Sequence, residues 1–174
     1  MVGPMAVPAA APPLHPDVAV LAPLLGTWAG RGRGEYPTIQ SFEYHEELIF
    51  SHVGKPFVVH TQRTRHADSG LPLHTETGYW RVAGVDAEGR AQVELILAQP
   101  TGAAEVHAGT LDSGEVTLRT TVVARSASAK QIDAVERKYR LEGDELRYRL
   151  AMAAVGQPLT HHLAGRLRRR PATD

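Results

Sequence analysis

Two adjacent histidines, His161 and His162, are the residues of this chain best suited to bind a metal ion or a haem iron. A neutral imidazole nitrogen is a common ligand for both. The chain contains no cysteine, which excludes disulfides, zinc thiolate sites, iron–sulfur clusters and a thiolate-ligated haem. The nine histidines include no His-Glu-x-x-His or His-x-His spacing, which disfavours a zinc site.

The two histidines are alternatives, because neighbouring side chains of a strand face opposite ways. In a strand over residues 158–169, His161 would share its face with three leucines, Leu159, Leu163 and Leu167. His162 would share its face with two small residues, Thr160 and Ala164. This alternation along the strand, or strand parity, therefore points His161 toward an apolar interior, unless that apolar face packs under an N-terminal helix instead.

Other chemistries have weaker support. Glu43, Glu46 and Glu47 lie close together and could suggest the paired carboxylates of a glycoside hydrolase. Adjacent residues alternate between the faces of a strand, so we expect a solvated strand there instead. No serine lies in a Gly-x-Ser-x-Gly turn, which disfavours a serine hydrolase. His52 and His74 are expected to be structural or to lie near a pocket.

The elements that must position these residues are mostly strands. Runs of about eight to twelve residues with alternating polarity, separated by turn residues, predict strands at 26–36, 44–52, 56–65, 73–82, 91–98, 102–111, 116–124, 132–141, 145–154 and 158–169. Short turns and the lack of a long helical insert favour an all-β fold, an antiparallel up-and-down β-barrel of about ten strands. A β-sandwich is the structural alternative. A closed barrel of this size leaves room inside for a ligand.

The N-terminal region is expected to differ from the barrel. Residues 1–13 carry four prolines and no basic residue, so we expect a disordered tail over 1–14 rather than a secretory signal. Asp17 is expected to cap a short helix over residues 18–25, which would place Val18, Leu21, Leu24 and Leu25 on one face. Residues 15–174 are then a single domain.

Composition limits the partners. Lysine plus arginine and aspartate plus glutamate both number 19, so the formal net charge is zero and no nucleic-acid partner is expected. We expect the arginine-rich run at 166–170 to be a solvated chain end. No run approaches the roughly 20 apolar residues that cross a bilayer, so no membrane partner is expected. The absence of cysteine fits a cytoplasmic protein, which would be a monomer or homodimer.

Residues 26–32, with the sequence GTWAGRG, form the most distinctive motif. Trp28 can close one end of a barrel, and Gly26, Gly30 and Gly32 allow sharp bending and close packing of strands. We interpret the motif as structural. A Gly-x-Trp segment after a short helix resembles the opening of the calycin barrels, which include lipocalins and fatty-acid carriers.

More of the chain resembles the nitrobindin family. The matching blocks occur in the same order over residues 21–170, at 26–32 (GTWAGRG), 35–39 (EYPTI), 42–47 (FEYHEE), 52–56 (HVGKP), 73–79 (LHTETGY) and 156–163 (GQPLTHHL). Each block is weak alone, whereas the ordered set is specific. The resemblance implies a ten-stranded barrel related to fatty-acid carriers that holds haem b, one per chain.

The resemblance also implies the activity and the site. Members of the family bind nitric oxide and isomerise peroxynitrite to nitrate at ferric iron. The axial histidine of the family matches His162, and its haem contacts match Thr38 and Lys130. The additional histidine, His161, departs from the family pattern and opens a choice of ligand, for which the family match favours His162. The alternative function is a non-catalytic nitric-oxide carrier or sensor, or an apolar-ligand carrier of the fatty-acid-binding type.

Overall fold

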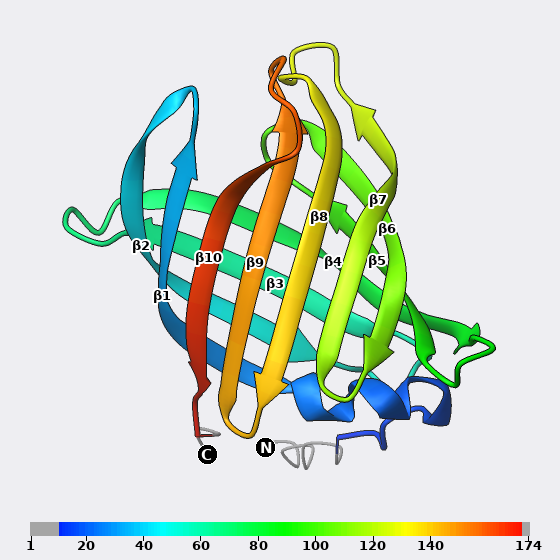
Figure 1. Ribbon diagram of the computed structural model, residues 1–174. Coiled ribbons are helices and arrows are strands. Elements are labelled where there is room, and N and C mark those ends of the chain that lie inside the picture. Colours follow the sequence, from blue (N-terminus) through cyan, green and yellow to red (C-terminus); the bar gives the residue numbers. More distant parts are fainter. Residues whose placement is uncertain (1–10, 172–174) are drawn as a thin grey trace, which may run out of the picture.

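The computed structural model describes residues 11–171 and contains a closed ten-stranded antiparallel barrel (Figure 1). Each strand pairs with the next along the chain, and the last strand pairs with the first. The elements are η1 (Pro16–Leu24), β1 (Gly26–Tyr36), β2 (Ile39–Ser51), β3 (Val58–His66), β4 (Pro72–Val85), β5 (Ala91–Ala98), β6 (Ala103–Asp112), β7 (Glu115–Arg125), β8 (Ile132–Glu142), β9 (Glu145–Ala154) and β10 (Thr160–Arg169). The predicted fold class is confirmed.

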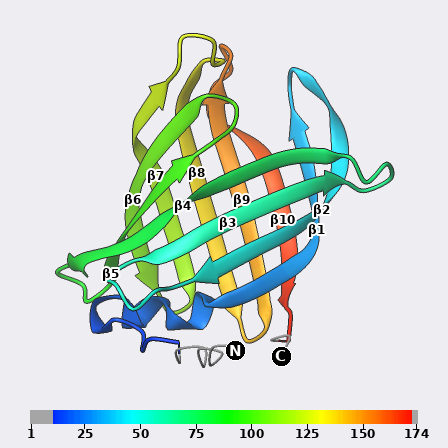
Figure 2. The same ribbon diagram turned by 180° about the vertical axis from the view of Figure 1, so that it is seen from behind.

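Strand positions follow the alternation of polarity. The bounds predicted for β1, β5 and β9 agree with the structure, whereas β2 begins at Ile39 rather than at Tyr44. A tight turn at 37–38 pairs Tyr36 directly with Ile39, so pairing extends β2 through a stretch that lacks clear alternation. Figure 2 shows the opposite wall, where β2, β3 and β4 cross behind the strands that are in front in Figure 1.

One end of the barrel is covered by η1 (Figure 1). This element is a 3-10 helix, and it buries Val18, Leu21 and Leu24 at a spacing of three residues, which matches its three residues per turn. The expectation that Asp17 caps it is wrong. His15 is the N-cap, because its Nδ1 accepts from the Asp17 backbone N–H, and Asp17 lies in the first turn.

The core lies at the η1 end. Trp28 is fully buried there, and its indole N–H donates to the Leu24 carbonyl over 2.7 Å. The Arg169 guanidinium stacks 4.1 Å from the Trp28 ring and donates to the Pro23 carbonyl over 2.7 Å. The interpretation of 166–170 as a solvated chain end is therefore wrong for Arg169, which joins β10 to the η1 end of the barrel.

The predicted tail lies mostly outside the described residues, since residues 1–10 are not among them. Residues 11–15 have no regular secondary structure, and Leu14 packs against the core. None of the helices within residues 11–171 combines the length and the apolar character needed to span a membrane.

Two paired glycines shape the barrel interior. Gly32 on β1 lies opposite Gly165 on β10, and the same cross-strand row continues to Tyr44 on β2 and Tyr148 on β9. A Cβ atom on Gly32 would lie 2.2 Å from the Tyr44 ring, and one on Gly165 would lie 2.3 Å from the Tyr148 ring. Because the glycines lack side chains, the two tyrosines lean over them and their hydroxyls meet at 2.5 Å.

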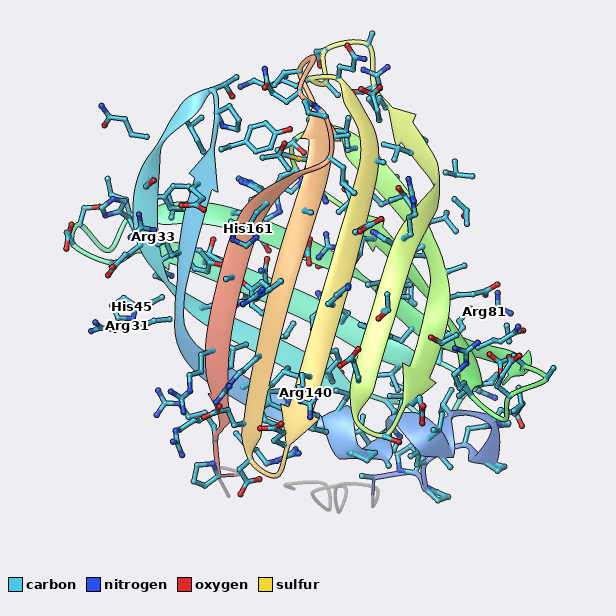
Figure 3. All side chains as sticks on the ribbon, viewed as in Figure 1. Arg31, Arg33, His45, Arg81, Arg140 and His161 are labelled. Atoms are coloured by element: carbon cyan, nitrogen blue, oxygen red, sulfur yellow. The ribbon has the colours of Figure 1, made fainter. Side chains whose placement is uncertain are left out.

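The outer wall carries a row of basic side chains. Six adjacent strands, from β3 through β2, β1, β10 and β9 to β8, each contribute one exposed member: Arg65, His45, Arg31, Arg166, Arg147 and Arg140. Figure 3 shows three of them, Arg31, His45 and Arg140, on the outside of the barrel. Like charges directly opposite one another are destabilising. Glu145 offsets part of this repulsion by pairing with both Arg147 and Arg166.

We expect Gly32→Ala to destabilise the protein by about 1–3 kcal/mol, because the new Cβ overlaps the Tyr44 ring. Urea unfolding measures the change. The control is a double-mutant cycle with Tyr44→Ala, in which removal of the ring should abolish most of the Gly32→Ala penalty. An equal penalty in both backgrounds would show that the ring is not the obstacle.

Candidate functional site

A cavity of about 610 Å³ occupies the barrel on the side away from the core. Its outer part is lined by apolar side chains: Ile39, Phe42, Leu73, Ile132, Met152 and Leu163. Its deeper part is lined by charged and hydroxyl-bearing side chains. A mostly apolar cleft of this size with a few placed polar groups is typical of a site for a small molecule or cofactor.

The structure brings three predicted site residues to this cavity. Thr38 lies in the turn between β1 and β2, Lys130 precedes β8, and His162 lies on β10, and all three line the cavity. Gly26, Trp28, Gly30 and Gly32 do not line it, which agrees with the structural interpretation of their motif. His74 also lines the cavity, whereas His52 accepts a hydrogen bond from the Gly54 backbone N–H.

An irregularity in β10 determines which of the adjacent histidines faces the cavity. His161 pairs with Ala151 and Leu163 pairs with Leu150, so His162 is an extra residue without its own partner on β9. Such a bulge shifts the alternation of faces by one residue. His162 and Leu163 consequently both line the cavity, whereas His161 is exposed on the outer wall (Figure 3). Simple parity is wrong here because of this bulge.

The His162 ring has the hydrogen bonding typical of a metal-binding histidine. Its Nδ1 lies 3.0 Å from the Glu35 carbonyl oxygen, and since a carbonyl only accepts, Nδ1 carries the proton and donates. The Nε2 lone pair is then the one available to a metal. The edge of the ring also packs against Tyr36, with centroids 5.3 Å apart. Burial lowers the pKa of His162 below its ordinary value of 6.5, which favours the neutral, ligating form.

These residues fit a haem. A flat macrocycle needs apolar walls, which the outer cavity provides, and one axial nitrogen, which His162 can supply. Lys130 lies exposed at the rim, where its ammonium can meet an acidic group of a bound molecule. No group of three or more His, Asp or Glu side chains within residues 11–171 is arranged to hold a bare metal ion.

Deeper in the cavity lies an ion network that the sequence analysis missed. The Arg137 guanidinium donates to both Glu76 oxygens, over 2.8 and 2.9 Å, and to Glu105 over 3.2 Å. His60 donates from Nε2 to Glu76 over 3.2 Å, because its Nδ1 accepts from the Trp80 indole. Burial raises the pKa of Glu76, but Arg137 and His60 outweigh it and hold that pKa far below its ordinary value.

Glu46 occupies a second buried position. The expectation of a solvated strand is wrong for this residue, whose side chain is 4% exposed. The Tyr148 hydroxyl donates to Glu46 over 2.5 Å, the Gln62 amide donates to it over 3.0 Å, and Tyr44 bonds to Tyr148. Burial raises the pKa of Glu46 to about 7. The signal was present in the sequence, because Glu46 shares the face of Tyr44 and the apolar residues that follow.

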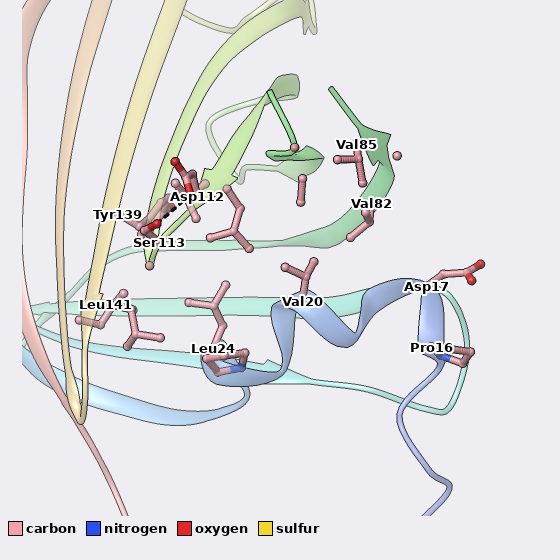
Figure 4. Close-up of a pocket in the computed structure, with 18 residues that line it drawn as sticks. Pro16, Asp17, Val20, Leu24, Val82, Val85, Asp112, Ser113, Tyr139 and Leu141 are labelled. Carbon is pink, nitrogen blue, oxygen red and sulfur yellow. Dashed lines mark hydrogen bonds between the residues drawn. The ribbon is translucent and has the colours of Figure 1, made fainter. Parts of the chain in front are cut away.

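A second hollow, of about 500 Å³, lies between η1 and the hairpins at the core end of the barrel (Figure 4). It is lined mainly by apolar side chains of η1 and of strand ends, among them Val20, Val82 and Leu141. It contains none of the predicted site residues. Tyr139 borders both hollows, so its ring lies between them. The cavity with His162 is therefore the candidate site.

Comparison with known proteins agrees with this geometry. The family model described as "THAP4-like, heme-binding beta-barrel domain" matches residues 17–169. The chain belongs to this family. A crystal structure of Rv2717c from M. tuberculosis, 47% identical in sequence, superposes with a TM-score of 0.82 and covers 91% of this chain and 99% of its own. The resemblance to nitrobindins is confirmed.

Curated members of this haem-binding barrel family carry an enzyme name. A protein of Mycobacterium marinum, named peroxynitrite isomerase 2, is 54% identical over 161 residues, which cover 90% of this chain and 97% of that protein. A protein of Nocardia farcinica, named peroxynitrite isomerase, is 54% identical over 160 residues, with 90% and 92% coverage. The family membership supports a haem cofactor for this chain.

We expect Arg137→Met to cost about 3–5 kcal/mol at pH 7, because it leaves Glu76 and Glu105 buried without their cation. The pKa of Glu76 is depressed in the folded protein, so its stabilising contribution is present above its ordinary pKa of 4.5 and is lost as the pH falls below it. The penalty of the variant should therefore shrink in acid. Urea unfolding at pH 7 and pH 4 measures both effects.

The matched control is Arg140→Met. Arg140 lies three residues further along β8 and is exposed, so its ion pairs contribute less than about 1 kcal/mol. Equal penalties for the two variants, or a penalty at Arg137 that does not depend on pH, would contradict the role assigned to the buried network.

Proposed function

We propose that this protein holds one haem b per chain with His162 as the axial ligand, and that it isomerises peroxynitrite to nitrate at ferric iron and binds nitric oxide. The observation that carries the proposal is the β10 bulge, which places His162 in the cavity with its Nδ1 bonded to the Glu35 carbonyl. The enzyme name of relatives at 54% identity supports the reaction. We propose a cytoplasmic monomer or homodimer.

In this reaction the chain's own residues bind the haem and orient its histidine ligand. Glu35 fixes the His162 tautomer, the apolar rim excludes water from the haem faces, and Thr38 and Lys130 hold the haem at the mouth. The haem supplies the redox-active iron at which the anion rearranges. The overall change breaks the O–O bond of peroxynitrite and forms an N–O bond, with no net gain of electrons or protons.

One observation separates this proposal from an apolar-ligand carrier. A carrier that binds a fatty-acid carboxylate deep inside a barrel needs a free cation at that depth, whereas Lys130 lies at the rim. Arg137 is the arginine that lines this cavity, and its guanidinium is already engaged by Glu76 and Glu105. A further carboxylate at that depth would meet two others. The cavity therefore favours haem over a fatty acid.

The first experiment is an optical spectrum of the purified protein reconstituted with haem, followed by nitrate yield from peroxynitrite. A Soret band with a raised nitrate yield over free decay supports the enzyme. If the protein shows a Soret band and binds nitric oxide but does not change the nitrate yield, the result would support a nitric-oxide carrier or sensor instead of an enzyme. The absence of any Soret band would refute the proposal.

We expect His162→Ala to abolish or severely weaken haem retention and peroxynitrite isomerisation, because it removes the axial nitrogen. His161→Ala should leave both largely intact, since that side chain lies on the outer wall. Haem titration of each variant, followed by nitrate yield, checks both. Loss of haem from His161→Ala with retention by His162→Ala would reverse the assignment of the ligand.

A further inference from the structure

The deep part of the cavity contains more carboxylates than guanidinium groups. Three buried carboxylates, Glu46, Glu76 and Glu105, line it together with one guanidinium, Arg137. Arg137 contacts the second and third of these but does not bond to Glu46. Among the described residues, no lysine, arginine or histidine nitrogen lies within ion-pair distance of Glu46, so this carboxylate has no cation of its own.

Glu46 is nevertheless well placed to exist in both protonation states. As a carboxylate it accepts from Tyr148 and Gln62. When Glu46 is protonated, Gln62 can turn its amide, since the Gln62 Oε1 atom has no hydrogen-bond partner and can accept a hydrogen bond from the new O–H. The charged and titratable groups that influence Glu46 or bond to it come from β4, β8, β9 and its own strand: Tyr44, Glu76, Arg137, Tyr139 and Tyr148. His60 on β3 lines the same cavity.

We propose that Glu46 is the redox-linked proton site of the haem cavity, which near neutral pH loses its proton while the iron is ferric and binds one when the iron becomes ferrous. This inference rests on the proposed function. One electron from an external one-electron donor reduces the iron, and one proton from solvent adds to the Glu46 carboxylate. The ionised carboxylate opposes the first step and so holds the iron in the ferric state that the proposed isomerisation uses.

The physical reason is Coulombic. Reduction removes one positive charge from the cavity, and a carboxylate in the same low-dielectric interior loses the attraction that kept it ionised. Glu76 cannot respond in this way, because Arg137 keeps it ionised. Burial raises the pKa of Glu46 to about 7, so a change in the charge of the iron shifts its protonation within the physiological range.

The experiment is a spectroelectrochemical titration of the haem-loaded protein between pH 5.5 and 8.5. The ferric/ferrous potential of the wild type should fall as the pH rises through neutrality. Glu46→Gln should make the potential nearly independent of pH. At pH 8.5 the potential of this variant should be higher than that of the wild type by about 59 mV, which corresponds to a tenfold shift of the one-electron equilibrium. At pH 5.5, where Glu46 is protonated in both redox states, the two proteins should converge.

Glu47→Gln is the matched control. Glu47 is the next residue of β2, faces the outer wall and is exposed, so the substitution removes the same charge without entering the cavity. Its potential should follow the wild type at every pH. If Glu47→Gln shifts the potential as much as Glu46→Gln does, the effect belongs to overall charge and the inference is wrong.

Tyr148→Phe provides a second variant if Glu46→Gln does not fold or retain haem. It removes the hydroxyl that stabilises the ionised carboxylate, so the pH-dependent segment of the potential should move to higher pH. The inference would be overturned if the wild-type potential did not depend on pH, or if the pH-dependent segment of the potential did not move in Tyr148→Phe. Intact haem binding and nitrate yield would show in that case that the proposed function still holds. A wild-type protein without a Soret band would instead refute the proposed function.

Discussion

Closure of the barrel between β1 and β10 is the constraint on which the rest of the molecule depends. The two strands pair in register from Trp28 with Arg169 to Gly34 with Leu163. A Cβ atom on Gly30 would lie 2.1 Å from the Arg166 carbonyl oxygen, so the backbones approach too closely there for any larger residue. Without this seam β1 and β10 would be open edges, and the interior would have no closed wall.

The seam also places the candidate ligand. His162 lies on β10, and its ring bonds to the carbonyl of Glu35 on β1. The bulge at His162 faces β9, so β10 gains its extra residue there while its pairing with β1 continues as far as Leu163. The strand pairing that closes the barrel therefore also fixes the tautomer of the residue that can bind iron.

The fold could be predicted from the sequence because each strand alternates between a core face and a solvent face, and a period of two is visible without tertiary information. The bulge at His162 could not, because it depends on how β10 registers against β9. Parity alone favoured His161, and only the family resemblance favoured His162. The 3-10 geometry of η1 could have been found, since Val18, Leu21 and Leu24 are spaced by three.

The composition does not show which charged residues are buried. A formal net charge of zero describes neither the row of basic side chains on the outer wall nor the excess of carboxylates inside. The prediction of a solvated strand at Glu46 rested on the acidic residues near it in sequence, Glu43 and Glu47, which do face outward. Its true neighbours are two residues away on the same face, where period two places Tyr44 and Leu48.

The glycine motif and the buried acid belong to one arrangement. Gly32 does not line the cavity, yet its missing side chain lets Tyr44 reach Tyr148, and Tyr148 in turn bonds to Glu46. A glycine that permits close packing at the seam thus also leaves room for Tyr44, which bonds to the tyrosine that donates to a buried carboxylate. Burial raises the pKa of Glu46 and hydrogen bonds to its ionised form lower it, so the packing of β1 against β2 contributes to this balance through Tyr44 and Tyr148.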